Sequence, residues 1–168
     1  MHSKFISTLV LCLFVFVGYS QDGDVAKKGQ DVSDLVFIVE NNKKIAMSDY
    51  KGKIVFINFF ANWCAPCKLE MPLLEKDVWL KHKNNKNFVM LSFGRGDDMA
   101  TVQKFQKQFN ATFPMYPDAS KEIYKNFATK YIPRNYIIKD GKIIYASKGF
   151  TNAEFAEMVE FLGEILEK

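Results

Sequence analysis

Cys64 and Cys67 are the residues of this sequence best suited to do chemistry. Two residues separate them in the segment Trp63-Cys64-Ala65-Pro66-Cys67, which lies between an apolar run and a segment that can form a helix. Two thiols at this spacing can close into a disulfide and reopen. At the start of a helix, free backbone N–H groups and the positive end of the helix dipole favour the thiolate of the first cysteine.

The two thiols are therefore predicted to have different roles. The Cys64 thiolate attacks a disulfide of a partner and forms a mixed disulfide, and Cys67 then attacks Cys64 and releases the reduced partner. Ala65 and Pro66 shape the turn between the two cysteines. The scheme needs no added cofactor, because the Cys64–Cys67 pair is itself the redox-active group.

A zinc site and a structural disulfide are the other uses of such a pair. Zinc needs four ligands, and after residue 20 the sequence contains only these two cysteines and His82. We therefore expect no metal. A bridge across so short a segment restricts little of the unfolded chain and stabilises a fold weakly. Redox chemistry is the favoured interpretation.

Residues 1–20 have the pattern of a secretory signal peptide. Lys4 precedes an apolar stretch over residues 5–17, and small or polar residues follow as far as Ser20. The stretch is shorter than the roughly 20 residues of a membrane span. We predict cleavage after Ser20, with loss of Cys12, and export to the periplasm or another extracytoplasmic compartment. An uncleaved segment that anchors the protein to a membrane is the alternative.

The rest of the chain has the composition of one globular domain. Of the 168 residues, 48% are hydrophobic and 25% are charged, which suits a single core. Residues 21–33 are polar and predict a flexible lead-in to a domain over residues 34–168. The net charge of +4 is spread evenly along the chain, which argues against nucleic acid or an anionic membrane surface as a partner.

The hydrophobic pattern predicts an α/β domain. Residues 54–60 and 88–93 have the apolar, β-forming composition of buried strands. Residues 67–82 predict a helix with a kink at Pro72, and Thr151 with Glu154 has the spacing of a capping box before a last helix. Two hairpins are expected, one around Asn41-Asn42 and one around Asp140-Gly141. Parallel and antiparallel pairing together predict a central mixed sheet flanked by helices, with an extra N-terminal hairpin.

Residues 54–72 resemble the thioredoxin-fold proteins, and in detail their exported TlpA/ResA-like branch. The resemblance covers about residues 34–168. It rests on Trp63 before the cysteines, Pro66 between them, Lys68, Glu70 and Pro72 after them, and Ile132-Pro133 further along the chain. It implies a thioredoxin-like fold and a thiol-disulfide oxidoreductase.

The resemblance also assigns residues to substrate binding. It implies that Pro133 is a cis-proline beside Cys64, and that the backbone of Ile132 pairs with an extended segment of the partner. It implies that Trp63 is an exposed platform next to the nucleophile. A trans-proline in a loop and an aromatic residue of the core are the alternatives for Pro133 and Trp63.

One departure from the thioredoxin pattern concerns proton transfer. Thioredoxins carry a buried aspartate six residues before the first cysteine, where this chain has Asn58. Glu70, one helical turn beyond Cys67, is the nearest candidate for proton transfer, and a solvated helix carboxylate is the alternative. Arg134 is predicted either to favour the thiolate or to lie on the surface.

The leading functional hypothesis is an extracytoplasmic reductase of disulfides in client proteins. By resemblance, a membrane-borne thiol donor keeps it reduced, and its clients include apocytochromes c during cytochrome c maturation. An oxidase or isomerase of folding proteins uses the same chemistry in another direction. A copper-binding metallochaperone on the same fold is the alternative from a different class.

Overall fold

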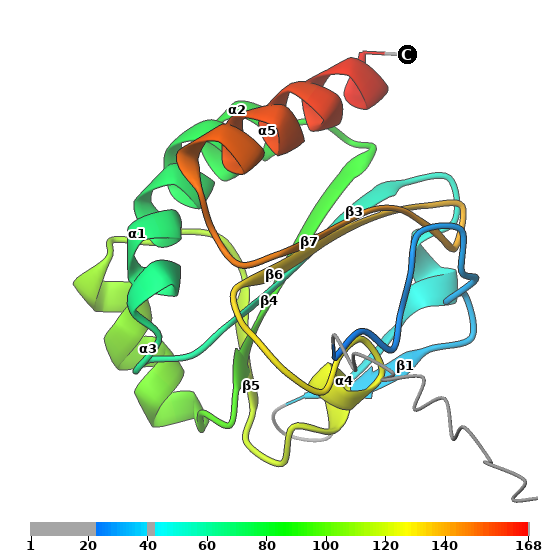
Figure 1. Ribbon diagram of the computed structural model, residues 1–168. Helices are drawn as coiled ribbons and strands as arrows, with labels where there is room; N and C mark the ends of the chain where they lie inside the picture. Colours follow the sequence, from blue (N-terminus) through cyan, green and yellow to red (C-terminus); the bar gives the residue numbers. More distant parts are fainter. Residues whose placement is uncertain (1–22, 40–42, 168) are drawn as a thin grey trace, which may run out of the picture.

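A computed structural model of the chain describes residues 23–39 and 43–167. Five strands form one sheet in the order β5-β4-β3-β6-β7 (Figure 1). The central strand β3 is parallel to β4 and antiparallel to β6, so the predicted mixed sheet is confirmed. The strands are β3 Ile54–Phe60, β4 Phe88–Arg95, β5 Met115–Asp118, β6 Arg134–Lys139 and β7 Lys142–Lys148.

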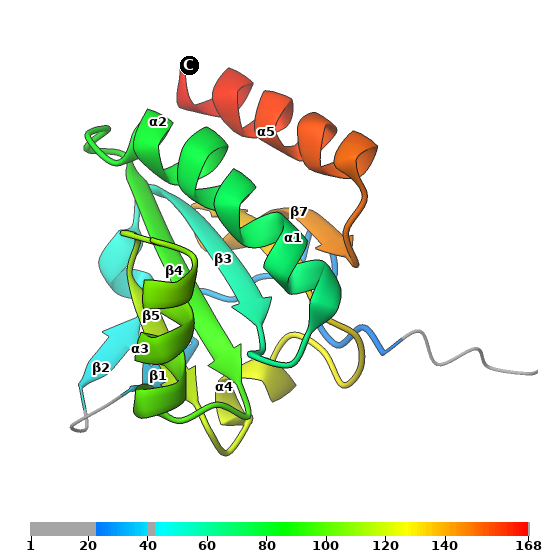
Figure 2. The same ribbon diagram turned by 90° about the vertical axis from the view of Figure 1, so that its left-hand side faces the viewer.

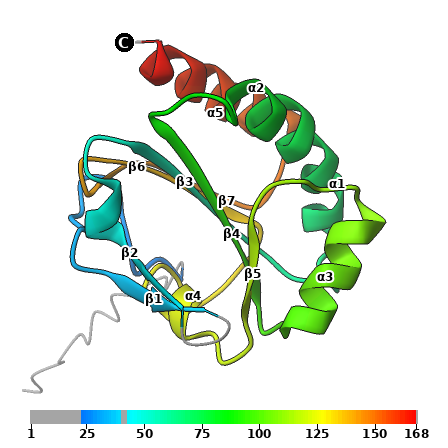
Figure 3. The same ribbon diagram turned by 180° about the vertical axis from the view of Figure 1, so that it is seen from behind.

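Helices cover one face of this sheet. The face carries α1, α3 and α5 (Figure 2), whereas α4 and a small hairpin of β1 and β2 lie on the opposite face (Figure 3). The helices are α1 Ala65–Leu73, α2 Leu80–His82, α3 Met99–Gln108, α4 Glu122–Lys125 and α5 Asn152–Leu166, and the hairpin strands are β1 Val36–Ile38 and β2 Lys44–Ala46. The thioredoxin-like α/β fold with an N-terminal hairpin is therefore confirmed.

The two covered faces explain why every residue of β3 is buried. Successive side chains of a strand point to opposite faces. Phe56 and Phe60 accordingly pack under α1 and α3, and Phe59 packs on the other side. There the Phe59 ring lies 5.7 Å from Phe93 and 5.2 Å from Phe127, centroid to centroid. Burial of this aromatic set makes β3 a rigid base for the cysteines that follow it.

Several local predictions are also confirmed. Asp140 and Gly141 have φ values of 50° and 76° at the turn between β6 and β7, which is the left-handed backbone of a tight hairpin. The Thr151 hydroxyl accepts a hydrogen bond from the Glu154 N–H at 3.2 Å and so caps α5. Pro72 lies inside α1, and a π-helical turn, Leu74–Trp79, follows it, where proline removes one backbone donor; the predicted kink itself stays a prediction.

Some predictions concern residues outside the described part of the chain. They are the signal peptide over residues 1–20, its cysteine Cys12, and the turn at Asn41-Asn42. Within residues 23–39 and 43–167, no helix has the length and apolar character that a membrane span requires.

Residues 23–33 differ from the predicted flexible lead-in, because they pack against the domain. The N–H groups of Val25 and Ala26 donate to the carbonyl oxygen of Phe127 at 3.1 and 2.9 Å. Ala26 and Val32 are buried in the core on the same side of the sheet as α4. Although this segment is mostly polar, two of its apolar residues are buried and its backbone is hydrogen-bonded to the domain, so the fold begins about ten residues before the predicted position at residue 34.

We expect Asp24→Asn to destabilise the protein. The Asp24 carboxylate forms an ion pair with Arg134, whose side chain is only 3% exposed. Loss of the carboxylate charge leaves a buried cation without its counter-ion, which costs about 2 kcal/mol of unfolding free energy at this partly exposed pair. Urea unfolding measures the change. Asp34→Asn is the matched control, because Asp34 is exposed, and it should change the unfolding free energy by less than about 0.5 kcal/mol. Equal effects of the two substitutions would contradict a stabilising role for the Asp24–Arg134 ion pair.

Candidate active site

Cys64 and Cys67 form a disulfide at the start of α1. Cys64 is the N-cap residue of the helix, and its Sγ accepts a hydrogen bond from the Cys67 N–H at 3.2 Å. This N–H group and the helix dipole would stabilise a thiolate on Cys64 once the bridge is reduced. Both side chains are buried, with exposed fractions of 3% for Cys64 and 0% for Cys67.

A loop with a cis-proline lies against Cys64. The Ile132–Pro133 peptide bond is cis, and the carbonyl oxygen of Ile132 lies 3.7 Å from Cys64 Sγ. The bridged sulfur carries no hydrogen, so this is a contact and not a hydrogen bond. The structure therefore brings Ile132 and Pro133 to the attacking cysteine, as the resemblance implied.

Buried side chains hold the backbone just before this loop. The Tyr124 hydroxyl donates to the carbonyl oxygen of Tyr131 at 2.6 Å, and Tyr131 has a φ of 66°. Arg134 Nε and Nη2 donate to the carbonyl oxygen of Lys130 at 3.0 and 2.8 Å. Arg134 is 2% exposed, so the prediction of a surface residue is wrong. Its guanidinium positions the loop and pairs with Asp24.

A groove of about 520 Å³ lies beside the disulfide. Trp63 and Tyr131 are large aromatic residues on its sides, with exposed fractions of 62% and 61%. Trp63 is therefore an exposed side chain and not a core aromatic. The residues around the groove are Trp63, Cys64, Ala65, Pro66, Arg95, Thr129, Lys130, Tyr131 and Ile132.

A buried polar network lies next to Cys67, one helical turn along α1. Asn58 Nδ2 and Asn135 Nδ2 donate to the two carboxylate oxygens of Glu70 at 3.2 and 2.6 Å. Asn58 Nδ2 also donates to Asn135 Oδ1 at 2.8 Å, and the Ser92 hydroxyl donates to Asn58 Oδ1 at 2.7 Å. Asn58 occupies the position of the buried aspartate of thioredoxins. Here it binds the carboxylate of Glu70 instead of carrying a carboxylate itself.

Burial dominates the protonation of Glu70. The side chain is 1% exposed. Loss of solvation raises the pKa of Glu70 to about 8, against the opposing effect of the hydrogen bonds from Asn135 and Asn58. The alternative of a solvated helix carboxylate is therefore wrong. A carboxyl group with this pKa can exchange a proton near neutral pH.

Comparison with known proteins places this geometry in a family. A family model described as the AhpC/TSA family matches residues 28–147, which is more than half of the chain. The chain belongs to the AhpC/TSA family. Among its relatives is the thiol-disulfide oxidoreductase ResA of Bacillus thuringiensis subsp. konkukian, which is 31% identical over 167 residues and aligns with 96% of this chain and 94% of its own length.

Solved structures support the same assignment. A candidate protein disulfide isomerase from Bacteroides thetaiotaomicron has a TM-score of 0.80 and 32% identity, and the match covers 87% of this chain and 94% of that one. StoA from Bacillus subtilis has a TM-score of 0.61 at 22% identity and covers 77% of this chain and 98% of its own, which shows the fold alone. This AhpC/TSA family member is a thiol-disulfide oxidoreductase.

The sequence analysis did not identify several residues that this AhpC/TSA family member brings to the site. Asn135 and Ser92 complete the network around Glu70, and Tyr131 and Arg95 border the groove. Asn135 had a detectable signal, because it is a polar residue inside a run that predicts a buried strand. Arg95 and Tyr131 had no such sequence signal, since nothing in the local pattern places them beside Cys64.

Proposed function

We propose that the protein is an extracytoplasmic reductase of disulfides in client proteins. In its reduced form, the Cys64 thiolate attacks a client disulfide and forms a mixed disulfide. Cys67 then attacks Cys64, the client leaves as a dithiol, and the protein ends with the Cys64–Cys67 bridge. Two electrons pass from the protein to the client in each cycle.

The contact of Cys64 with the Ile132–Pro133 loop carries this proposal. Cys64 borders the groove, whereas Cys67 does not, so a client sulfur can reach only Cys64 without a change in the helix. The backbone of Ile132 lies 3.7 Å from that sulfur and can pair with an extended client segment. The exposed ring of Trp63 supplies apolar contact area on the other side of the nucleophile.

Glu70 handles the proton of Cys67 in this proposal. Cys67 must lose its proton before it attacks Cys64. Glu70 is buried one helical turn away, and its pKa of about 8 allows it to accept and return a proton near neutral pH. Asn58 and Asn135 hold the carboxyl group in place through hydrogen bonds to its two oxygens.

The cellular setting follows from the N-terminal pattern and the relatives. Residues 1–20 have the composition of a secretory signal, and relatives are named ResA. We propose that the protein works outside the cytoplasm, that a membrane-borne thiol protein reduces its disulfide, and that apocytochromes c are among its clients. An uncleaved signal would tether it to the membrane.

The direction of electron flow is tested by the redox equilibrium with glutathione. A reductase should have a midpoint near that of thioredoxin, about −270 mV. Alkylation of free thiols followed by mass spectrometry gives the reduced fraction at each ratio of reduced to oxidised glutathione. A midpoint close to about −120 mV would assign the protein as an oxidase instead.

A copper metallochaperone is the competing function from another class. Equilibrium dialysis of the reduced protein against Cu(I) separates the two. The reductase should reduce insulin disulfides repeatedly with a thiol donor. Tight stoichiometric copper binding without disulfide turnover would favour the metallochaperone.

A further inference from the structure

Arg95 places a positive charge in the groove beside the disulfide. It is the last residue of β4, directly after Gly94, which pairs with Phe60 at the end of β3. Its side chain borders the same groove as Cys64 and the loop that carries Ile132. A client segment that lies against that loop therefore passes close to the guanidinium group.

The guanidinium of Arg95 packs on an aromatic ring and forms no ion pair among the described residues, although the charge of Asp118 lies close enough to interact with it. It lies over the ring of Tyr124, with Cζ 4.7 Å from the ring centroid. Its Nε is buried and has no hydrogen-bond acceptor among residues 23–39 and 43–167. The ion pairs found in this part of the chain involve Lys81, Lys125 and Arg134, and none involves Arg95. A buried donor without an acceptor is costly.

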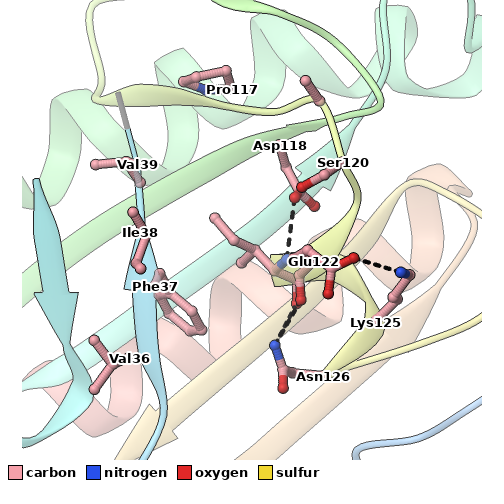
Figure 4. A pocket seen from close by; sticks show the side chains of 12 residues that line it. Val36, Phe37, Ile38, Val39, Pro117, Asp118, Ser120, Glu122, Lys125 and Asn126 are labelled. Carbon is pink, nitrogen blue, oxygen red and sulfur yellow. Dashed lines mark hydrogen bonds and ion pairs between the residues drawn. The ribbon is translucent and has the colours of Figure 1, made fainter. Parts of the chain in front are cut away.

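The acidic residues that lie near Arg95 in the structure or in the sequence are bound to other groups. Asp97 accepts hydrogen bonds from the backbone and side chain of Asn62. Asp98 caps α3 through the Thr101 N–H at 2.8 Å. The Asp118 carboxylate, whose charge also interacts with Arg95, accepts hydrogen bonds at the start of α4 from the Ile123 N–H at 3.1 Å and from the Tyr124 N–H at 2.8 Å; Figure 4 draws the first of the two.

We propose that Arg95 binds a carboxylate on the client, next to the cysteine that Cys64 attacks. A planar guanidinium held against an aromatic ring offers a carboxylate two parallel N–H donors. The client class is then a disulfide-bonded segment with Asp or Glu beside its reactive cysteine. This specificity rests on the proposed reductase function and adds a substrate preference to it.

The test measures single-turnover reduction of a peptide with one intramolecular disulfide. The reduced protein, freed of excess reductant, is mixed with the peptide, so that two protein thiols become a disulfide and the peptide disulfide becomes two thiols. Three versions of the peptide carry Glu, Gln or Lys on either side of the attacked cysteine. Acid quenching and mass spectrometry give the rates as a function of peptide concentration.

The wild-type protein should reduce the Glu peptide about tenfold more efficiently than the Gln peptide, as expected for one charge-assisted contact. Arg95→Gln should bring this ratio close to one, and Arg95→Lys should restore part of it. Arg95→Glu should prefer the Lys peptide. Lys125→Gln is the matched control, because Lys125 is an exposed cation outside this groove, paired with Glu122, and the ratio should keep its wild-type value.

Failure of this proposal and failure of the reductase function give different results. Equal rates for the three peptides with the wild-type protein would overturn the role of Arg95 and leave the reductase function intact. Reduction of none of the peptides would overturn the reductase function itself. The same preference in Arg95→Gln as in the wild type would assign the preference to other residues and overturn the proposal.

Discussion

Cys64→Ser should abolish the reduction of insulin disulfides, with a loss of roughly a thousandfold or more, because the attacking thiolate is gone. Turbidity of the released insulin chains in the presence of dithiothreitol measures this loss against the uncatalysed rate. Thermal unfolding should show that the variant still folds, since a bridge across three residues stabilises the chain weakly.

Cys67→Ser should instead keep the first step and lose the second. The variant should accumulate a mixed disulfide between Cys64 and the client, which peptide mapping locates. The Cys64 sulfur borders the groove, whereas Cys67 is fully buried behind it. Accumulation of a mixed disulfide at Cys67 in the Cys64→Ser variant would reverse the two roles.

Glu70→Gln should change the pH dependence of stability. The pKa of Glu70 is about 8 in the folded protein, against an ordinary value of 4.5. Between these values the folded state keeps a proton that the unfolded state has released. The stabilising contribution is therefore full below pH 4.5 and is lost as the pH rises to about 8, by an amount on the order of 5 kcal/mol.

Urea unfolding between pH 4 and 9 measures the slope of the unfolding free energy against pH. Glutamine cannot ionise, so the variant should lose less stability over this range than the wild type. Glu157→Gln, at an exposed position of α5, is the matched control and should keep the wild-type slope. Identical slopes in Glu70→Gln and the wild type would show that Glu70 is already ionised at neutral pH in the folded protein.

The sequence was sufficient to predict those features that depend on neighbouring residues. The strand Ile54–Phe60, the turn at Asp140-Gly141 and the cap at Thr151 each follow from a pattern of a few residues. The cysteine pair belongs to this group, since its chemistry depends on its spacing and its place at a helix start.

Features that depend on pairs distant in the sequence could not be predicted. Glu70 meets Asn135, which is 65 positions away, and Asp24 meets Arg134, which is 110 positions away. Only the folded sheet brings these residues together. The same reason explains why a polar segment that looked flexible is packed, and why Arg95 was not connected with the disulfide.

The packing of residues 23–26 decides how the protein can be attached to a surface. Gly23 accepts a hydrogen bond from the Thr129 N–H at 2.8 Å, and Thr129 borders the redox groove. Gly23 therefore lies close to the groove, and we expect a tag joined at this end to hinder large clients more than a tag at the C-terminal end. The C-terminal end of α5 lies near His82 at the end of α2, away from the start of α1, where the cysteines lie (Figure 1). Immobilisation through that end leaves the disulfide open to solution.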